Sequence, residues 1–178
     1  MAKRRHFSVE IRIRKLKQLF NSFDPSPFIE KDLDDKAFEY IVSSVKEHNL
    51  KDEGRIVIHL PKREKKKVPE ENVISAIKHN LEFRKKLEER DIKRKLVEGQ
   101  KSMTVGLTFL AICLFLRQLI LSFEPNLFLD VFSEGLLIVG WVAMWKPISN
   151  ILYDWVPLKK DIHVFEKIHD MPIHFVYE

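Results

Sequence analysis

The sequence predicts a membrane α-helical hairpin of two transmembrane helices, inserted in a small cytoplasmic α/β domain with about three strands. Two apolar segments joined by a turn predict the hairpin. Alternating apolar residues before and after these segments predict the strands, and most charges lie outside the apolar segments. The chain of 178 residues is 45% hydrophobic and 32% charged, an average that hides the concentration of apolar residues in one block.

The N-terminal part begins with an alternating pattern and then changes period. Apolar side chains at every second position of 7–13 predict a half-buried strand. From Leu16 they recur every three or four residues, which predicts a short amphipathic helix ending near Phe23. A basic helix over 7–20, lying on a membrane surface, is the alternative interpretation.

A loop, a helix and a strand are expected to follow. Two prolines make 21–27 a loop, in which Asp24 is expected to stabilise a turn through its side chain. Asp32 is expected to cap a helix over 33–45 that has one apolar face. The apolar run 56–60, stopped by a proline, predicts a short buried strand.

The rest of the chain places the hairpin between helical segments. Apolar residues at helical spacing among charges over 70–100, with no internal proline, predict a long stalk helix that runs into the first apolar segment. A short interfacial helix is expected between Pro147 and Pro157, before a helix over 159–169 and a strand over 171–177. The predicted domains are a cytoplasmic α/β part with the stalk helix (1–101), a transmembrane hairpin (102–145), and an interfacial helix with a C-terminal cytoplasmic strand (146–178).

The two apolar segments have the length and composition of membrane spans. Residues 103–123 hold fifteen apolar side chains and one charge, and 127–145 hold fourteen and two acids. Roughly 20 helical residues cross the hydrocarbon core of a bilayer. Glu124-Pro125-Asn126 predicts a tight turn between them. A buried helical hairpin in a globular core is the alternative interpretation.

The charges flanking the spans predict their orientation. Basic residues precede the first span and follow the second, whereas the tip offers only Glu124. The positive-inside rule then places both termini in the cytoplasm, and the first residues contain no apolar leader segment. The hairpin has a net charge of −2 and the remaining residues +7, so a basic domain is expected to face anionic lipid.

Three ionisable residues lie within the spans. Arg117 and Glu134 are expected at similar depth, on the order of 12 Å from the turn, and Asp130 lies one helical turn from Glu134. In one interpretation Arg117 and Glu134 form a structural pair that fixes the register of the hairpin. In the other, Asp130 and Glu134 line a path for ions or protons between protomers.

A basic run and an aromatic cluster are candidate contacts for lipid. The run consists of Lys62, Arg63, Lys65, Lys66 and Lys67, and basic residues near an anionic membrane surface are attracted to it. A solvated loop is the alternative, and nucleic acid is not expected because no aromatic residue is interleaved to stack bases. Trp145 and Trp155 belong to a cluster after the second span that is typical of an interfacial belt.

Signatures of catalysis and of cofactor binding are weak. The sequence contains no Gly-rich phosphate loop, nucleophile elbow or C-x-x-C pair, and its single Cys113 lies within the first span. His59 and His174 lie on candidate strands, where ordinary packing is the expected role. The acids at 32–35 have the chemistry to hold a divalent cation, but helix capping explains them better. We therefore expect no enzyme, metal or cofactor.

Five segments resemble a bacterial family of small two-span membrane proteins. These segments are NSFDPSPF at 21–28, DLDDKAFEYI at 32–41, GRIVIHLP at 54–61, EGLLIVGWVAMWKP at 134–147 and YDWVP at 153–157. The last two are the most specific. The resemblance implies a bacterial inner-membrane location and brings no activity, cofactor or catalytic residue with it.

Two functions are compatible with these features. The first is a non-enzymatic inner-membrane protein that self-associates through its hairpin, or joins a larger membrane complex, and presents a cytoplasmic docking or scaffold module. The second is a homo-oligomeric ion channel or pore with Asp130 and Glu134 lining the path. An enzyme in which Asp24 and the acids at 32–35 bind metal ranks third. Membrane lipid is the expected partner, without nucleic acid or an identified small-molecule substrate.

Overall fold

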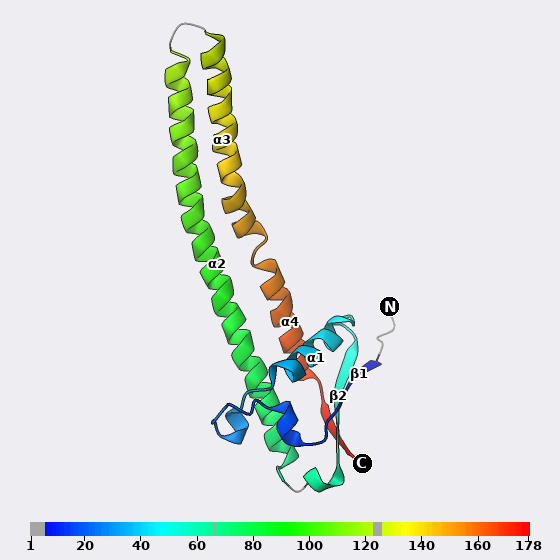
Figure 1. Ribbon diagram of the computed structural model, residues 1–178. Coiled ribbons are helices and arrows are strands. Elements are labelled where there is room, and N and C mark those ends of the chain that lie inside the picture. Colours follow the sequence, from blue (N-terminus) through cyan, green and yellow to red (C-terminus); the bar gives the residue numbers. More distant parts are fainter. Residues whose placement is uncertain (1–5, 66, 123–125) are drawn as a thin grey trace. The chain divides into compact units, whose positions relative to one another are not determined.

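The computed structural model (Figure 1) describes residues 6–65, 67–122 and 126–178. The chain folds as two compact units. The first consists of Met1–Glu88 and Lys160–Glu178, and the second of Glu89–Lys159. In the sequence, the second unit therefore lies between two parts of the first.

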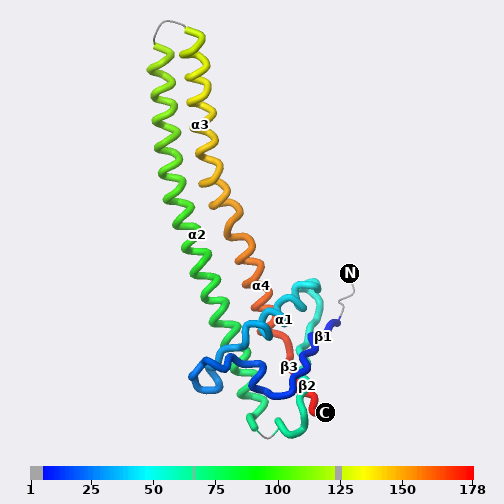
Figure 2. Tube along the Cα trace, in the orientation of Figure 1, coloured from blue at the N-terminus to red at the C-terminus, as the bar shows by residue number. Residues whose placement is uncertain are grey.

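A parallel sheet forms the centre of the first unit (Figure 2). Its strands, in spatial order, are β1 (His6–Arg12), β2 (Glu53–Leu60) and β3 (Ile173–Tyr177). In the central strand, Ile56 lies opposite Val9 of β1 and Ile173 of β3. All three predicted strands are confirmed. The alternative of a basic surface helix over 7–20 is wrong, because the first residues of that segment pair with β2.

Helices cover one face of this sheet. They are α1 (Asp35–Lys46), the first turns of α2 (Glu70–Ile120) and the last turns of α4 (Val156–Asp170). The apolar face predicted for α1 is confirmed, because Phe38, Ile41, Val42 and Val45 are buried. The strands contribute every second side chain to the same core, as a half-buried strand does: Val9, Ile11, Ile56, Ile58 and Leu60.

Two local expectations in this unit are wrong. The cap of α1 is Asp34, whose carboxylate accepts hydrogen bonds from the backbone N–H groups of Lys36 and Ala37, and not Asp32. The amphipathic helix expected from Leu16 is only the short 3-10 helix η1 (Leu16–Leu19). The next residue, Phe20, is extended and bridges to Leu33, which ends the helical turn.

Two further 3-10 turns connect the elements of the first unit. η2 (Phe28–Glu30) follows the proline-rich loop, and η3 (Lys62–Glu64) follows β2 directly after Pro61. At the start of β2, a Cβ added to Gly54 would lie 2.5 Å from Phe7 Cζ. This close approach explains why the second residue of the strand is a glycine, which has no Cβ.

The second unit is a pair of long helices. α2 runs without a break through the predicted stalk into the predicted first span, and α3 (Leu127–Leu152) runs antiparallel beside it (Figure 1). Asn126 caps α3 by accepting a hydrogen bond from the Phe128 N–H. Of the predicted turn, Glu124 and Pro125 lie outside the described residues.

Both helices are long and apolar enough to cross a membrane. Their most apolar windows are only 11% and 17% buried within the structure. A core helix of a soluble protein is mostly buried, and these two windows are mostly exposed.

The second helix continues beyond its predicted end. α3 passes through Pro147 to Leu152, so the separate interfacial helix expected between Pro147 and Pro157 is wrong. Pro147 lacks the N–H that would bond to the Ala143 carbonyl, but the helix tolerates this single loss. Pro157 does not end a helix; it lies at the second residue of α4, where a backbone N–H has no partner within the helix.

Candidate functional site

Small residues line the contact between α2 and α3. Within the second unit, small buried residues recur every seven residues in each helix, the repeat of left-handed helix packing. They are Gly99, Gly106 and Cys113 in α2, and Ser133, Gly140 and Pro147 in α3. We call this set the seam. Its small side chains let the two backbones approach closely, as in helix pairs within membranes.

The spaces around the glycines show which of them the seam requires. A Cβ added to Gly140 would lie 2.8 Å from Leu110 Cδ1 and 3.2 Å from Cys113 Cβ. A Cβ added to Gly106 would lie 3.0 Å from Met144 Sδ. Gly135 differs from both, because nothing lies within 4 Å of a Cβ added there. Gly135 therefore lies outside the seam.

The structure brings two of the three predicted intramembrane residues together. Arg117 Nη2 lies 3.5 Å from Glu134 Oε1, which joins α2 to α3. The side chain of Arg117 is 30% exposed, whereas that of Glu134 is 63% exposed. Arg117 Nε is buried and has no hydrogen-bond partner among the described residues. Arg117 is thus the inner member of the pair and Glu134 the outer one.

Asp130, the third of these residues, is not part of the pair. It is exposed on α3, and no ion pair between described residues includes it. Its backbone carbonyl accepts a hydrogen bond from the Ser133 hydroxyl at 2.8 Å. Asp130 and the outer side of Glu134 therefore present acidic groups on the surface of the helix pair.

Two of the four described residues of the predicted basic run contact other side chains of the first unit. Lys67 Nζ lies 2.6 Å from Glu64 Oε1, and Lys65 Nζ lies 5.3 Å from the centre of the Tyr177 ring. Lys62 and Arg63 are exposed, and Lys66 lies outside the described residues. The run thus offers fewer free cations than its sequence predicts.

The two tryptophans predicted to contact lipid belong to the second unit. Trp145 is exposed on α3. Trp155 lies in the short break between α3 and α4, where its Nε1–H donates to the Ile151 carbonyl at 2.9 Å. Lys159 Nζ lies 5.4 Å from the centre of the Trp155 ring. An indole with a satisfied polar edge beside a cation is typical of an interfacial position.

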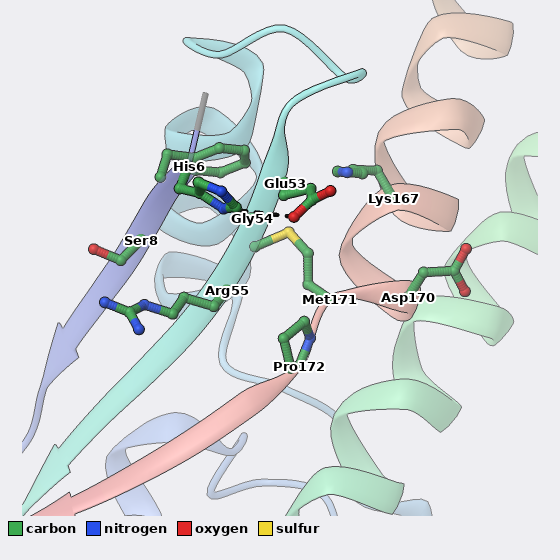
Figure 3. A pocket seen from close by; sticks show the side chains of 10 residues that line it. His6, Ser8, Glu53, Gly54, Arg55, Lys167, Asp170, Met171 and Pro172 are labelled. Carbon is green, nitrogen blue, oxygen red and sulfur yellow. Dashed lines mark ion pairs between the residues drawn. The ribbon is translucent and has the colours of Figure 1, made fainter. Parts of the chain in front are cut away.

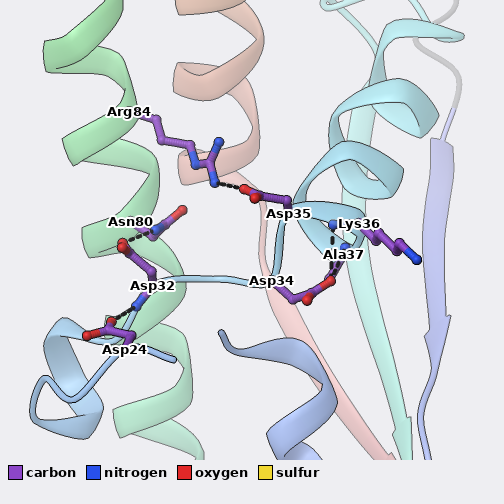
Figure 4. Close-up of polar contacts among 8 residues, drawn as sticks. All are labelled: Asp24, Asp32, Asp34, Asp35, Lys36, Ala37, Asn80 and Arg84. Atoms are coloured by element: carbon purple, nitrogen blue, oxygen red, sulfur yellow. Dashed lines mark hydrogen bonds and ion pairs between the residues drawn. The ribbon is translucent and has the colours of Figure 1, made fainter. Parts of the chain in front are cut away.

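A chain of polar contacts holds the proline-rich loop of the first unit (Figure 4). The Asp24 carboxylate accepts from the Ser26 N–H at 2.9 Å and from the Asp32 N–H at 2.6 Å. Asp32 Oδ1 in turn accepts from Asn80 Nδ2 at 2.7 Å, and Asn80 is only 2% exposed. The expected turn-stabilising role of Asp24 is confirmed, and Asp32 anchors the loop to α2.

Acid is expected to loosen this loop through Asp24. The hydrogen bonds from Ser26 and Asp32 favour the carboxylate and lower the pKa of Asp24 from 3.8 to about 2. Because the folded pKa is the lower one, Asp24 stabilises the fold fully above about pH 4, and this contribution is lost as the pH falls towards 2. Thermal unfolding from pH 7 to pH 2.5, followed by circular dichroism, should show a smaller acid-dependent loss for Asp24→Asn. Glu30→Gln, a nearby exposed carboxylate, should behave as the wild type.

The acids at 32–35 all have structural partners. Asp34 caps α1, and Asp35 Oδ1 lies 2.7 Å from Arg84 Nη2, whose guanidinium stacks on the Phe38 ring. Over the described ranges, no three His, Cys, Asp or Glu side chains gather as a metal ion requires. Their positions favour capping and anchoring over the expected alternative of a cation site.

The two strand histidines do not form a ligand pair. His174 lies opposite Val57, on the strand beside that of His59. The contacts of His59 are with carboxylates: Nδ1 lies 3.0 Å from Glu178 Oε1, and Nε2 lies 3.9 Å from Glu10 Oε2. His59 therefore belongs to a polar cluster on the face of the sheet that carries no helix.

A cavity of about 490 Å³ lies where the strands begin (Figure 3). Met171 lies over Gly54 at its centre, and Lys167 extends towards Glu53. His6 Nδ1 lies 3.5 Å from Glu53 Oε2. Charges of both signs line this cavity, so it favours no single class of charged ligand.

Comparison with known proteins gives no match to this chain, whether with family models, with curated proteins or with solved structures. The resemblance to a two-span bacterial family stays a prediction.

Proposed function

We propose that this protein is a non-enzymatic component of the bacterial inner membrane. In this proposal α2 and α3 cross the bilayer as a hairpin, and the α/β unit acts in the cytoplasm as a docking or scaffold module. The observation that most directly supports this proposal is that α2 and α3 pack on each other through small residues while their apolar side chains point outward. A surface of this kind is stable in lipid and costly in water.

The distribution of charge supports the proposed orientation. Basic residues flank the hairpin on the side of its two ends, and Glu124 is the only charge in the sequence of its tip. Cytoplasmic loops carry an excess of Lys and Arg in membrane proteins. A cytoplasmic position of the α/β unit follows from this rule.

The outer acids support self-association. Arg117 is the single base within the hairpin, and it pairs with Glu134 from its inner side. Asp130 and the exposed side of Glu134 have no described cation beside them. Exposed carboxylates are costly in hydrocarbon, so a second copy of the hairpin, or a larger membrane partner, is the expected cover.

Purification from native membranes tests this proposal. The protein should stay in the membrane pellet after carbonate extraction, and its mass in mild detergent should exceed that of one chain. A reporter fused after Glu178 should be cytoplasmic. Release by carbonate, a periplasmic reporter or a lone monomer would each contradict one part of the proposal.

A channel is the second candidate, favoured by the exposed acids of α3. If Asp130 and Glu134 line a cation path, Asp130→Asn with Glu134→Gln should abolish cation flux into liposomes that hold the protein. The scaffold proposal instead expects no flux from the wild type above that of empty liposomes.

A further inference from the structure

A second cavity of the first unit, with a volume of about 540 Å³, combines basic and apolar side chains. Such a volume lies in the range of pockets that hold small organic ligands. Its walls come from three stretches of sequence: the segment around η1, the loop that follows it, and the residues after β2. Its basic side chains are Lys15, Lys17, Lys31 and Lys67, and we call it the lysine pocket.

Hydrogen bonds fasten the walls of the lysine pocket to one another. The Glu64 carboxylate, in a residue only 4% exposed, accepts from the Leu16 N–H at 3.2 Å and so joins the segment after β2 to η1. The Asn21 N–H donates to the Asp32 carbonyl at 2.8 Å, which joins the start of the loop to its end. The pocket therefore exists before a ligand arrives, and a preformed site lowers the entropic cost of binding.

Among the described residues that line the lysine pocket, Glu64 is the one carboxylate. Lys67 Nζ donates to Glu64 Oε1 at 2.6 Å. This hydrogen bond and that from the Leu16 N–H lower the pKa of Glu64 below its ordinary value, so Glu64 is ionised at neutral pH. Glu64 and Lys67 therefore neutralise each other, and the remaining charge of the pocket comes from the other three lysines.

Lys15, Lys17 and Lys31 leave the pocket with an excess of positive charge. None of them belongs to an ion pair between described residues. Lys31 contributes to the lowered pKa of Asp24, but the Asp24 carboxylate already accepts from two backbone N–H groups. Three ammonium groups suit a ligand with more than one negative charge, and a phosphate monoester carries about −1.5 to −2 at pH 7.

Apolar side chains accompany these charges. Leu16 and Phe20 line the pocket and are 5% and 3% exposed, so they belong to its floor. Phe28 and Val68 line it as well but are only half-buried, which leaves part of each open to a ligand. The Phe28 ring packs edge to face on Phe20, with 4.9 Å between the ring centres. A fixed aromatic ring of this kind offers a surface for a planar aromatic group.

We propose that the lysine pocket binds a phosphate monoester that carries an aromatic group, such as a mononucleotide. Lys15, Lys17 and Lys31 hold the phosphate, and the aromatic group lies on the Phe28 ring. The site is built from the first unit alone, so it does not require the proposed membrane location. It gives the proposed docking module a soluble ligand.

Calorimetric titration of the full-length protein in nonionic detergent, at one salt concentration, tests the pocket. The probes are adenosine monophosphate, adenosine and ribose 5-phosphate. We expect adenosine monophosphate to bind at least tenfold more tightly than the other two, because it alone has both groups. No binding of adenosine monophosphate overturns the proposal. Equal binding of ribose 5-phosphate would overturn the aromatic contact, and equal binding of adenosine would overturn the contact of the lysines with phosphate.

Variants with matched charge locate the phosphate. Lys15→Gln with Lys17→Gln should weaken the binding of adenosine monophosphate at least fivefold. Lys36→Gln with Lys51→Gln changes the net charge equally at exposed sites outside the pocket and should leave the affinity within twofold. Equal losses in the two double variants would show a nonspecific charge effect and overturn the site.

Two substitutions of Phe28 locate the aromatic group. Phe28→Leu should weaken the binding of adenosine monophosphate at least threefold and leave any weak binding of ribose 5-phosphate unchanged. Phe28→Tyr keeps the ring and should stay within twofold of the wild type. A loss of affinity for both probes in Phe28→Leu would indicate a disturbed pocket and contradict the stacking, as would an affinity for adenosine monophosphate equal to that of the wild type.

Discussion

Gly140→Leu is expected to open the hairpin. The position has no room for a side chain, because a Cβ there would already lie 3.2 Å from Cys113 Cβ and 2.8 Å from Leu110 Cδ1. Forcing extra methylene groups into a packed contact costs about 1–3 kcal/mol, and here the strain falls on the contact between α2 and α3. Cys113 is the single cysteine of the chain and is buried in the seam. Its reaction with a membrane-permeant maleimide therefore measures opening.

A leucine substitution at Gly135 provides the matched control, since Gly135 lies on the same helix as Gly140. Nothing lies within 4 Å of a Cβ added to Gly135, so Gly135→Leu should label at the wild-type rate. In reconstituted bilayers, Gly140→Leu should speed the labelling of Cys113 at least fivefold. Equal rates for the two leucine variants would show that the helices do not pack through this seam in the membrane.

Arg117→Leu is expected to destabilise the hairpin more than Arg117→Leu combined with Glu134→Leu. The single change leaves Glu134 without its cation, and an unpaired charge within a bilayer costs roughly 3 kcal/mol. The double change removes both charges and leaves two apolar side chains in their place. Breaking a pair by removing one member is generally more harmful than replacing both members.

Titration with sodium dodecyl sulfate, followed by the labelling of Cys113, measures this difference. The detergent concentration at the midpoint of unfolding should fall most for Arg117→Leu and least for the double variant. Glu134→Leu should lie between them, because the arginine that remains can extend towards the interface. Additive effects of the two single changes would mean that the 3.5 Å contact stabilises nothing.

The order and type of the strands and of the helices α1 and α2 followed from the sequence, because periodicity reports which side chains are buried. The alternation in β1 and the apolar face of α1 each correspond to burial in one core. Element ends were harder to predict. Asp32 and Asp34 carry the same side chain, and only the tertiary contact of Asp32 with Asn80 removes it from the cap. Helix α3 also passes Pro147, where the sequence favoured a boundary.

The candidate sites show the same difference between contacts that follow from sequence position and contacts that depend on the tertiary fold. Arg117 and Glu134 were predictable as neighbours, because equal distances from one turn place residues at one depth of a hairpin. The hydrogen bond between Asp32 and Asn80 was not predictable, because the two residues are far apart in sequence and meet only when the loop folds against α2. The run 62–67 also forms contacts that its sequence does not reveal. Lys67 pairs with Glu64, and Lys65 lies over the Tyr177 ring.

The position of β3 has a consequence for the biogenesis of the protein. The first two strands of the sheet precede α2, whereas β3 follows α4. A ribosome therefore completes α2 and α3 before it makes the residues that pair with the second edge of β2. Until then β2 presents unpaired backbone groups, which are open to association with other chains. The sheet can therefore be completed only after the helix pair has been synthesised, and a chain arrested before β3 keeps this edge of β2 unpaired.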